Sequence, residues 1–211
     1  MVPMPSPEDS RASTQLSLPI AYGPDERRTL LDIAFASIRH GLSTHHPLSV
    51  ASDDYYAALQ TPRATFVTLQ LEGQLRGCIG TLEARRPLVV DVAENAFAAA
   101  FRDPRFLALS AAELTTLECH ISVLGTPVAM AFDSETDLIA QLRAGIDGLV
   151  LEEVGGYRGT FLPSVWEQLP APRDFFSQLK RKAGLRQDYW SETLRVLRYE
   201  TTGFHGAFAD L

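Results

Sequence analysis

A seven-residue segment, residues 75–81 (Leu-Arg-Gly-Cys-Ile-Gly-Thr), constrains the fold of this chain more than any other. The residues before it, 66–71, are rich in β-forming side chains, and Glu72-Gly73 is typical of a tight turn. Two such runs around a short turn indicate a β-hairpin whose return strand contains the segment. The hairpin places one of the chain's two cysteines inside a strand.

Cys78 is the candidate nucleophile. Along a regular strand, residues two apart point to the same side, so we expect Arg76, Cys78 and Gly80 on one face. A guanidinium beside a thiol favours the reactive thiolate, which makes Arg76 the candidate thiolate or anion stabiliser. Gly80 leaves room for a backbone or a ligand, and Gly77 indicates a bulge or a close contact. The alternative is that Cys78 is a small buried hydrophobe and Arg76 is solvated or ion-paired.

Composition excludes several classes of protein. The 211 residues, 45% of them hydrophobic, suit one domain with a substantial core. A net charge of −7 argues against a nucleic-acid binder and against an anionic membrane surface as partner. Two cysteines do not make a disulfide scaffold, and no apolar run approaches the roughly 20 residues of a membrane span. We therefore expect a cytoplasmic protein. No Cys or His pair has zinc-finger spacing, so no metal ligands are predicted, and the cofactor stays unknown.

The chain is expected to be one domain, residues 18–211, after a disordered leader of residues 1–17 that is rich in Pro and Ser. Helices and hairpins alternate without a regular βαβ repeat. This order predicts an α+β fold, with a curved, mainly antiparallel sheet and packed helices. Helices are predicted at residues 24–42, 87–102, 134–144, 163–169 and 172–183, a helical turn after Ser110, and further strands at residues 117–124, 148–154, 157–161 and 194–201. The basic run at residues 180–182 is interpreted as a solvated face.

A second motif, Asp103-Pro-Arg-Phe106, ends the helix at residues 87–102. Its structural interpretation is a local acceptor, a helix stop and a core plug. Its functional interpretation is that Asp103 and Arg105 project toward the hairpin as binding residues, with Phe106 beside them. Asn95, inside the apolar helix, is a further binding candidate because its amide could bond across a cleft.

His120 is the one histidine predicted to lie in the middle of a strand, beside Cys119. A base for Cys78 would have to be a residue such as His120. Nothing in the sequence places the two together, so this pairing is only a hypothesis.

A set of motifs between residues 24 and 204 resembles the AMMECR domain family, whose bacterial and archaeal members are called AmmeMemoRadiSam system protein A. The motifs are Leu75–Gly80, Asn95-Ala96, Ala99–Phe101, Asp103–Phe106, Ile121–Leu124, Gly145–Gly148, Phe161–Pro163 and Lys182–Leu185. The resemblance implies a single α+β domain of two lobes with a cleft between them. It also implies a genomic association with a Memo-like protein and a radical-SAM protein, but it supplies no reaction. The motif residues it carries over are Arg76, Gly77, Cys78, Gly80, Asp103, Arg105 and Phe106.

Two functions follow as hypotheses. In the first, the chain is an enzyme in which Cys78 attacks as a thiolate while Arg76 and Arg105 hold an anionic substrate. In the second, it is a non-catalytic binding or adaptor module for its radical-SAM and Memo-like neighbours. Its cleft would then hold a peptide segment or small molecule, and Cys78 would be structural. His120 departs from the family pattern, where a hydrophobic or acidic residue is more common, and this weakens a Cys78–His120 mechanism.

Overall fold

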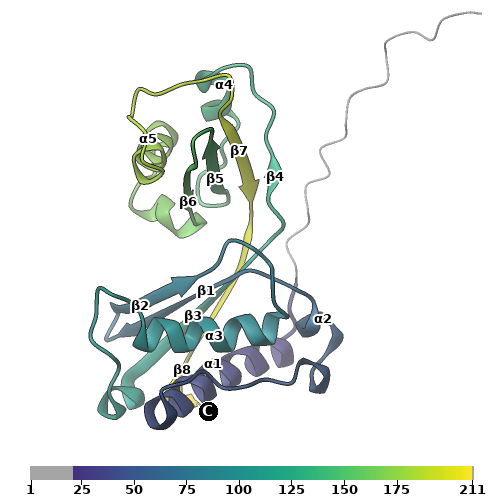
Figure 1. Ribbon diagram of the computed structural model, residues 1–211, viewed down its shortest axis with the longest axis vertical. Coiled ribbons are helices and arrows are strands. Elements are labelled where there is room, and N and C mark those ends of the chain that lie inside the picture. Colours follow the sequence, from purple (N-terminus) through teal and green to yellow (C-terminus); the bar gives the residue numbers. More distant parts are fainter. Residues whose placement is uncertain (1–20, 211) are drawn as a thin grey trace, which may run out of the picture.

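The computed structural model describes residues 21–210, and the strands in this part of the chain form two antiparallel sheets (Figure 1). The α+β class and the mainly antiparallel pairing are thus confirmed. The first sheet has the order β2–β1–β3–β8, with β1 (Thr65–Leu71), β2 (Gln74–Gly80), β3 (Leu117–Leu124) and β8 (Thr201–Ala207). The second has the order β4–β7–β5–β6, with β4 (Val128–Ala129), β5 (Gly148–Glu153), β6 (Tyr157–Phe161) and β7 (Arg195–Tyr199). The predicted leader, residues 1–17, lies outside the described residues.

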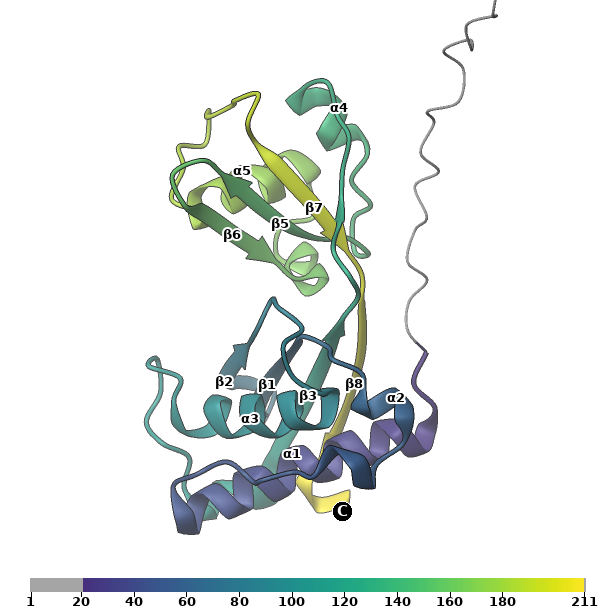
Figure 2. The ribbon, with the colours of Figure 1, turned by 45° about the vertical axis from the view of Figure 1, so that its right-hand side comes forward.

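Each sheet has its own helices and its own buried cluster (Figure 2). The first sheet packs against α1 (Pro24–Thr44) and α3 (Leu88–Phe101), with the short α2 (Ala57–Gln60) beside them. The second packs against α5 (Pro172–Lys182) and α4 (Glu135–Ala140). Short 3-10 turns occur at Ser52–Asp54, Ala111–Thr116, Pro163–Glu167 and Phe208–Asp210. None of the helices in residues 21–210 has the length and apolar character needed to cross a membrane.

The predicted hairpin is confirmed and is made by its turn residues. Glu72 and Gly73 both have positive φ, 51° and 74°, as a two-residue turn matching the twist of its strands requires. β1 alternates Val67 and Leu69, which are fully buried against the helices, with half-exposed residues. The face of the first sheet away from α1 and α3 is therefore the one that carries polar side chains.

The end of the chain differs from the prediction of a single strand at residues 194–201. There are two strands, because the chain leaves the second sheet after Tyr199 and enters the first at Thr201. The connection after β3, which leads from the first sheet to the second, runs alongside this one. The Gly125 N–H donates to the Glu200 carbonyl at 2.8 Å. A Cβ on Gly125 would lie 3.1 Å from that oxygen, so glycine lets the two connections lie close together.

Other element boundaries also differ. The helix predicted at residues 134–144 ends at Ala140, and the one predicted at residues 163–169 is a 3-10 turn, Pro163–Glu167. The short β4 and α2 were not predicted, since two and four residues are too few to show a periodicity.

Lys180 corrects the interpretation of the basic run as a solvated face. Its side chain is fully buried, and Nζ donates to Glu135 Oε1 at 2.9 Å and to the Tyr189 carbonyl at 3.1 Å. It lies one turn after Phe176, on the face of α5 that packs into the second core. Within the run, Arg181 and Lys182 are exposed.

We expect Lys180→Ala to lower the free energy of unfolding by about 3 kcal/mol, because it leaves the Glu135 carboxylate and a backbone carbonyl without their donor. Arg181→Ala is the matched control, since it removes an exposed cation from the next position of the same helix. Urea unfolding followed by circular dichroism measures both. Equal losses in the two variants would contradict a structural role for the buried ammonium.

Candidate functional site

Four polar side chains form a row across the first sheet, on the face away from its helices. Cys78 of β2 is paired with Thr68 of β1, Thr68 with His120 of β3, and His120 with His205 of β8. Neighbouring positions such as Val67 and Cys119 are buried against the helices, so the row faces the opposite way. The topology thus brings His120 onto the same face as Cys78, with Thr68 between them.

Cys78 is half-buried, and three hydrogen bonds hold it: one to its thiol and two to its backbone. Its Sγ accepts a hydrogen bond from Thr68 Oγ1 at 3.2 Å. Its backbone N–H donates to Asp103 Oδ2 at 2.8 Å, and its carbonyl accepts from Arg105 Nη2 at 3.3 Å. The two predicted binding residues of the Asp103–Phe106 motif therefore bond directly to the backbone of the candidate nucleophile.

Asp103 and Arg105 form a tight pair at the end of α3. The Asp103 carboxylate is only 2% exposed and accepts from Arg105 Nε at 2.9 Å and Nη2 at 2.6 Å. The hydrogen bond from the Arg105 guanidinium, helped by the backbone N–H groups of Cys78 and Arg105, holds the pKa of Asp103 well below its usual range. The carboxylate is thus an ionised anchor that fixes a half-exposed guanidinium beside Cys78.

Arg76 is placed differently from the expectation based on a regular strand. The pairing register shifts between Leu69 and Gln70, which leaves Arg76 in a β-bulge. Its Nε donates to Glu113 Oε1 at 2.6 Å and its Nη2 to the Leu107 carbonyl at 2.9 Å. The hydrogen bond from Arg76 lowers the pKa of Glu113 to about 2. These bonds tie the loop after α3 to the hairpin, so Arg76 positions a neighbouring segment.

The Phe106 ring lies close to two guanidinium groups, those of Arg76 and Arg105. Its ring centroid is 5.8 Å from Cζ of Arg76 and 5.5 Å from Cζ of Arg105. Both separations are within the range of a cation–π contact, which helps hold the two side chains in place.

The two glycines of the segment are explained by packing within the first sheet. A Cβ on Gly77 would lie 2.1 Å from the Ala99 carbonyl oxygen of α3. A Cβ on Gly80 would lie 2.4 Å from the Thr65 carbonyl oxygen and would overlap the Phe66 ring. The close approach that both glycines predicted is confirmed, and the chain itself makes it.

Asn95 belongs to a buried network between α3 and β1. Its Nδ2 donates to Thr65 Oγ1 at 2.9 Å and to Asp91 Oδ2 at 2.8 Å. The same Asp91 oxygen accepts from the Thr65 backbone N–H at 3.0 Å. Asn95 is only 3% exposed, so its amide joins a helix to a strand inside one unit.

Lys182 is a candidate site residue that sequence reasoning missed. It ends α5 of the second sheet, with Nζ 5.1 Å from the centroid of the Phe161 ring. Although the Lys182 side chain is partly exposed, desolvation of its ammonium lowers the pKa of Lys182; a negative charge on Cys78 raises that pKa, and the positive charge of Arg105 lowers it. The ammonium of the second sheet therefore shares an electrostatic environment with the thiol of the first. Its signal was its place in the Lys182–Leu185 motif, which the solvated-face interpretation of residues 180–182 obscured.

The two strand histidines and the second cysteine have distinct environments. Burial lowers the pKa of His120, with a further lowering from His205, whose ring stacks at a centroid distance of 5.0 Å. Cys119 faces the core, and burial raises the pKa of its thiol to about 12. Of the two cysteines, Cys78 is the one that is partly exposed. Among residues 21–210, no three His, Cys, Asp or Glu side chains are grouped so that they could hold a metal ion.

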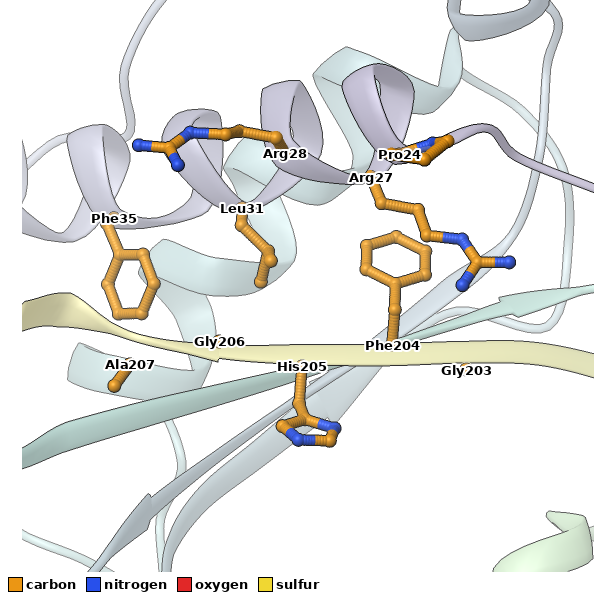
Figure 3. A pocket seen from close by; sticks show the side chains of 10 residues that line it. All are labelled: Pro24, Arg27, Arg28, Leu31, Phe35, Gly203, Phe204, His205, Gly206 and Ala207. Carbon is orange, nitrogen blue, oxygen red and sulfur yellow. The ribbon is translucent and has the colours of Figure 1, made fainter. Parts of the chain in front are cut away.

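Within the described residues, hollows lie on two sides of the first sheet. One, of about 670 Å³, is lined by both sheets and begins at Gly80, two residues from Cys78 on the same strand. Its lining is Gly80, Thr81, Leu82, Glu83, Arg85, Arg86, Asp91 and Arg158. The other, of about 540 Å³, lies between α1 and β8, on the helix side of the edge strand (Figure 3).

The fold defines a class of α+β protein: two antiparallel sheets are joined by two chain connections that lie side by side, and one sheet carries the motif cysteine on the face away from its helices. This class has a structural relative. The crystal structure of an uncharacterized protein from Pyrococcus horikoshii is similar, with a TM-score of 0.75 and 29% identity over 83% of this chain and 89% of that one. The sequence model of the AMMECR1 family matches residues 31–204, and this chain belongs to that family. The predicted family resemblance is thereby confirmed.

Archaeal proteins are among the sequence relatives. A protein of Methanothermobacter thermautotrophicus is 36% identical over 193 residues, which cover 87% of this chain and 97% of that protein. A protein of Methanocaldococcus jannaschii is 31% identical over 163 residues, covering 74% of this chain and 79% of that protein.

Proposed function

We propose that this AMMECR1-family protein is an enzyme whose nucleophile is the Cys78 thiolate and whose substrate is an anionic electrophile. The observation that carries the proposal is the position of Cys78: it is half-buried on the face of the first sheet away from α1 and α3, and the Arg105 guanidinium donates to its carbonyl at 3.3 Å. Lys182, at the end of α5, interacts electrostatically with the same thiol. Positive charge beside a thiol favours the thiolate, which is the attacking form.

Each neighbour of Cys78 has a role in this proposal. The Thr68 hydroxyl donates a hydrogen bond that stabilises negative charge on Sγ. Arg105, fixed by Asp103, and Lys182 offset that charge and attract an anionic group of the substrate. Asp103 acts through the Cys78 backbone and Arg105, so it is a positioning residue.

The predicted lobes correspond, in this proposal, to the two sheets with their helices, and the predicted cleft to the space between them. The 670 Å³ hollow supports this, because Gly80 and Thr81 of one sheet and Arg158 of the other line it. Glu83 and Arg158 form an ion pair across it, Oε1 to Nη1 at 3.2 Å.

We also propose, as the family resemblance implies, that the protein acts together with a radical-SAM protein and a Memo-like protein. We expect it to do so in the cytoplasm. Both cysteines of the chain are free thiols, as a reducing compartment favours.

Two alkylating reagents test the thiol directly. We expect Cys78 to react with neutral iodoacetamide at pH 7 about tenfold faster than free cysteine does, while Cys119 stays unmodified in the folded protein. The rate enhancement at Cys78 over free cysteine should be larger with anionic iodoacetate, because Arg105 and Lys182 attract its negative charge. Mass spectrometry of the two cysteine-containing peptides gives both rates. A Cys78 rate at or below that of free cysteine with both reagents would overturn the enzyme proposal.

The variant Lys182→Met distinguishes two causes of fast alkylation at Cys78: the positive charge beside the thiol and the exposure of the thiol. It should reduce the iodoacetate rate at Cys78 several-fold and the iodoacetamide rate less. Arg181→Met, which removes the neighbouring exposed cation, is the matched control and should leave both rates unchanged. Equal effects of the two variants on these rates would show that Lys182 does not act on Cys78.

The binding or adaptor function has one observation in its favour: Cys78 uses its backbone N–H and carbonyl to hold the Asp103–Phe106 motif, a structural role that needs no thiol chemistry. Co-purification with the radical-SAM and Memo-like neighbours distinguishes the two functions. Unchanged pathway output with Cys78→Ala, together with loss of the complex with Arg105→Ala, would favour the adaptor.

A further inference from the structure

The hollow of about 670 Å³ that both sheets line is rich in arginine. Its volume falls in the range of roughly 300–1,000 Å³ that is usual for small-molecule sites. Arg85 and Arg86 come from the segment between β2 and α3, and Arg158 comes from β6 of the second sheet. Guanidinium groups attached to both sheets thus line one cavity of ligand size.

The Arg86 guanidinium is fixed by Asp91, a buried residue of α3. Asp91 Oδ1 accepts from Arg86 Nε at 3.1 Å and from Nη2 at 2.8 Å. The other oxygen, Oδ2, accepts from the Thr65 backbone N–H and from Asn95, so this carboxylate is part of the packing between α3 and β1. Glu94 Oε2 lies 3.8 Å from Arg86 Nη1, which is too far for a hydrogen bond. Asp91 therefore holds the Arg86 guanidinium at the wall of the hollow.

Glu83 is the lining carboxylate that a ligand can displace. Its side chain is exposed, and it accepts hydrogen bonds from Arg85 Nε at 2.7 Å and from Arg158 Nη1 at 3.2 Å. The hydrogen bond from Arg85, and then that from Arg158, lowers the pKa of Glu83, so the carboxylate is ionised at neutral pH. Ion pairs between exposed side chains contribute little stability, because water competes for both partners. Glu83 thus holds, weakly, a position between two guanidinium groups that suits an external oxyanion.

We propose that the hollow binds the phosphate group of a small phosphate monoester, which takes the place of the Glu83 carboxylate on Arg85 and Arg158 and also bonds to Arg86. Once Glu83 is displaced, the charged residues left in the lining are three arginines and Asp91, a balance of two positive charges. A phosphate monoester carries a charge of about −2 at neutral pH. The charge of the ligand therefore matches that of the site.

The geometry of the guanidinium groups also suits a phosphate. Each carries five N–H donors in a planar fork that matches two oxygens of a phosphate. Arg158 Nε bonds to Glu152 at 3.2 Å, whereas its Nη1 is the nitrogen that bonds to Glu83. Glu152 thus keeps the side chain in place while Nη1 exchanges one oxyanion for another. Because Arg158 belongs to the second sheet and Arg85 follows a strand of the first, a bound phosphate joins the two sheets.

The hollow begins close to the candidate nucleophile. Gly80 lines it and lies two residues from Cys78 along β2, a rise of about 7 Å. A monoester with its phosphate in the hollow can therefore extend its organic part toward the thiol. This last step rests on the proposed function, in which Cys78 attacks an anionic electrophile, whereas the phosphate site itself needs no reactive thiol.

Titration of the full chain with inorganic phosphate tests the site. At neutral pH and constant ionic strength, we expect saturable shifts of the Gly80, Thr81 and Glu83 amide signals in heteronuclear NMR spectra. Glu83→Gln should bind phosphate about tenfold more tightly, because its side chain no longer competes as an anion. Arg158→Met should bind phosphate about tenfold more weakly, since it removes a charge-assisted hydrogen bond.

Arg186→Met is the matched control. Arg186 is another exposed arginine that bonds to a carboxylate two residues away, Asp188, and it is not among the lining residues of the hollow. Its loss should leave the affinity for phosphate unchanged. Acetate, titrated in the same way, should bind more weakly than phosphate because it carries a single charge. The same spectra show whether each variant is folded.

Four results would overturn the proposal. The first is a lack of saturable shifts with phosphate in both the native chain and E83Q. The second is equal affinity for phosphate in R158M and R186M. The third is equal affinity in the native chain and E83Q, because Glu83 would then not be displaced. The fourth is acetate binding as tight as that of phosphate, which would assign the hollow to a carboxylate.

The alkylation rates at Cys78 separate this site from the enzyme proposal. Slow alkylation of Cys78 with intact phosphate binding would overturn the enzyme proposal and support the phosphate site alone. Fast alkylation without phosphate binding would overturn the phosphate site and leave the enzyme proposal standing.

Discussion

Replacing Gly77 with alanine is expected to lower the free energy of unfolding by about 3 kcal/mol or more, among the largest effects of a single added methyl group. The new Cβ would lie 2.1 Å from the Ala99 carbonyl oxygen, and the next nearest atom, the Ala99 carbonyl carbon, is 3.0 Å away. Both belong to the backbone of α3, so no side-chain rotation relieves the overlap. The helix must move away from the sheet, and the packing between β2 and α3 is lost with it.

Gly203→Ala is the matched control. It adds the same methyl group to a strand of the same sheet, at a position where no atom of the described residues, apart from the chain neighbours, lies within 4 Å of the new Cβ. We expect a change within about 0.5 kcal/mol. Urea unfolding of both variants, with an unchanged slope against denaturant, gives the comparison. Similar losses would show that the cost comes from the glycine backbone rather than from contact with α3.

The sequence predicted the hairpin and its glycines because their causes are local. Glu72-Gly73 takes a turn that its residue types favour, and a glycine inside a strand indicates a close neighbour wherever that neighbour comes from. It did not predict which neighbour: for Gly77 this is the Ala99 carbonyl of the next helix, set by tertiary packing. It also assumed a regular strand, and the bulge at Arg76 depends on how β1 and β2 align.

The missing parts of the fold and the site depend on contacts between distant segments. Neither a glycine nor a proline separates Tyr199 from Thr201, so no turn signal marks the switch from β7 to β8. Thr68 became a site residue only through its pairing with Cys78, and Lys182 through the approach of α5 from the second sheet. Lys180 was interpreted as solvated because a charge run is usually so; its acceptors, Glu135 and the Tyr189 carbonyl, are 45 and 9 residues away.

Replacing Asp103 with asparagine is expected to destabilise the fold by about 2 kcal/mol at pH 7 and to make its stability less dependent on pH. The carboxylate accepts from Arg105 and from the Cys78 backbone N–H, and asparagine keeps its shape without its charge. The hydrogen bond from Arg105 depresses the pKa of Asp103 in the folded state, whereas the unfolded chain has the ordinary value of 3.8. A depressed pKa stabilises the fold above the unfolded value, and this contribution is lost as the pH falls toward the folded one.

The sign and size of the pH effect follow from that difference. Between pH 7 and pH 2.5 the unfolded state takes up a proton at Asp103 that the folded state does not, which reduces the stability of the native chain by roughly 2 kcal/mol. D103N lacks this loss, so the gap between the two proteins should narrow to near zero at pH 2.5. Glu113, whose pKa is lowered to about 2 by Arg76, contributes in the same window, but it is present in both proteins and cancels.

The matched control is Asp54→Asn, at an exposed carboxylate away from the hairpin. It should change stability by less than about 0.5 kcal/mol at either pH. Chemical unfolding at pH 7 and pH 2.5 measures all three proteins. A gap between the native chain and D103N that stays constant with pH would mean that the Asp103–Arg105 pair is not the source of the depressed pKa. The rate of Cys78 alkylation by iodoacetate should also fall in D103N. Without the Asp103 carboxylate, Arg105 is no longer held with its charge beside the thiol.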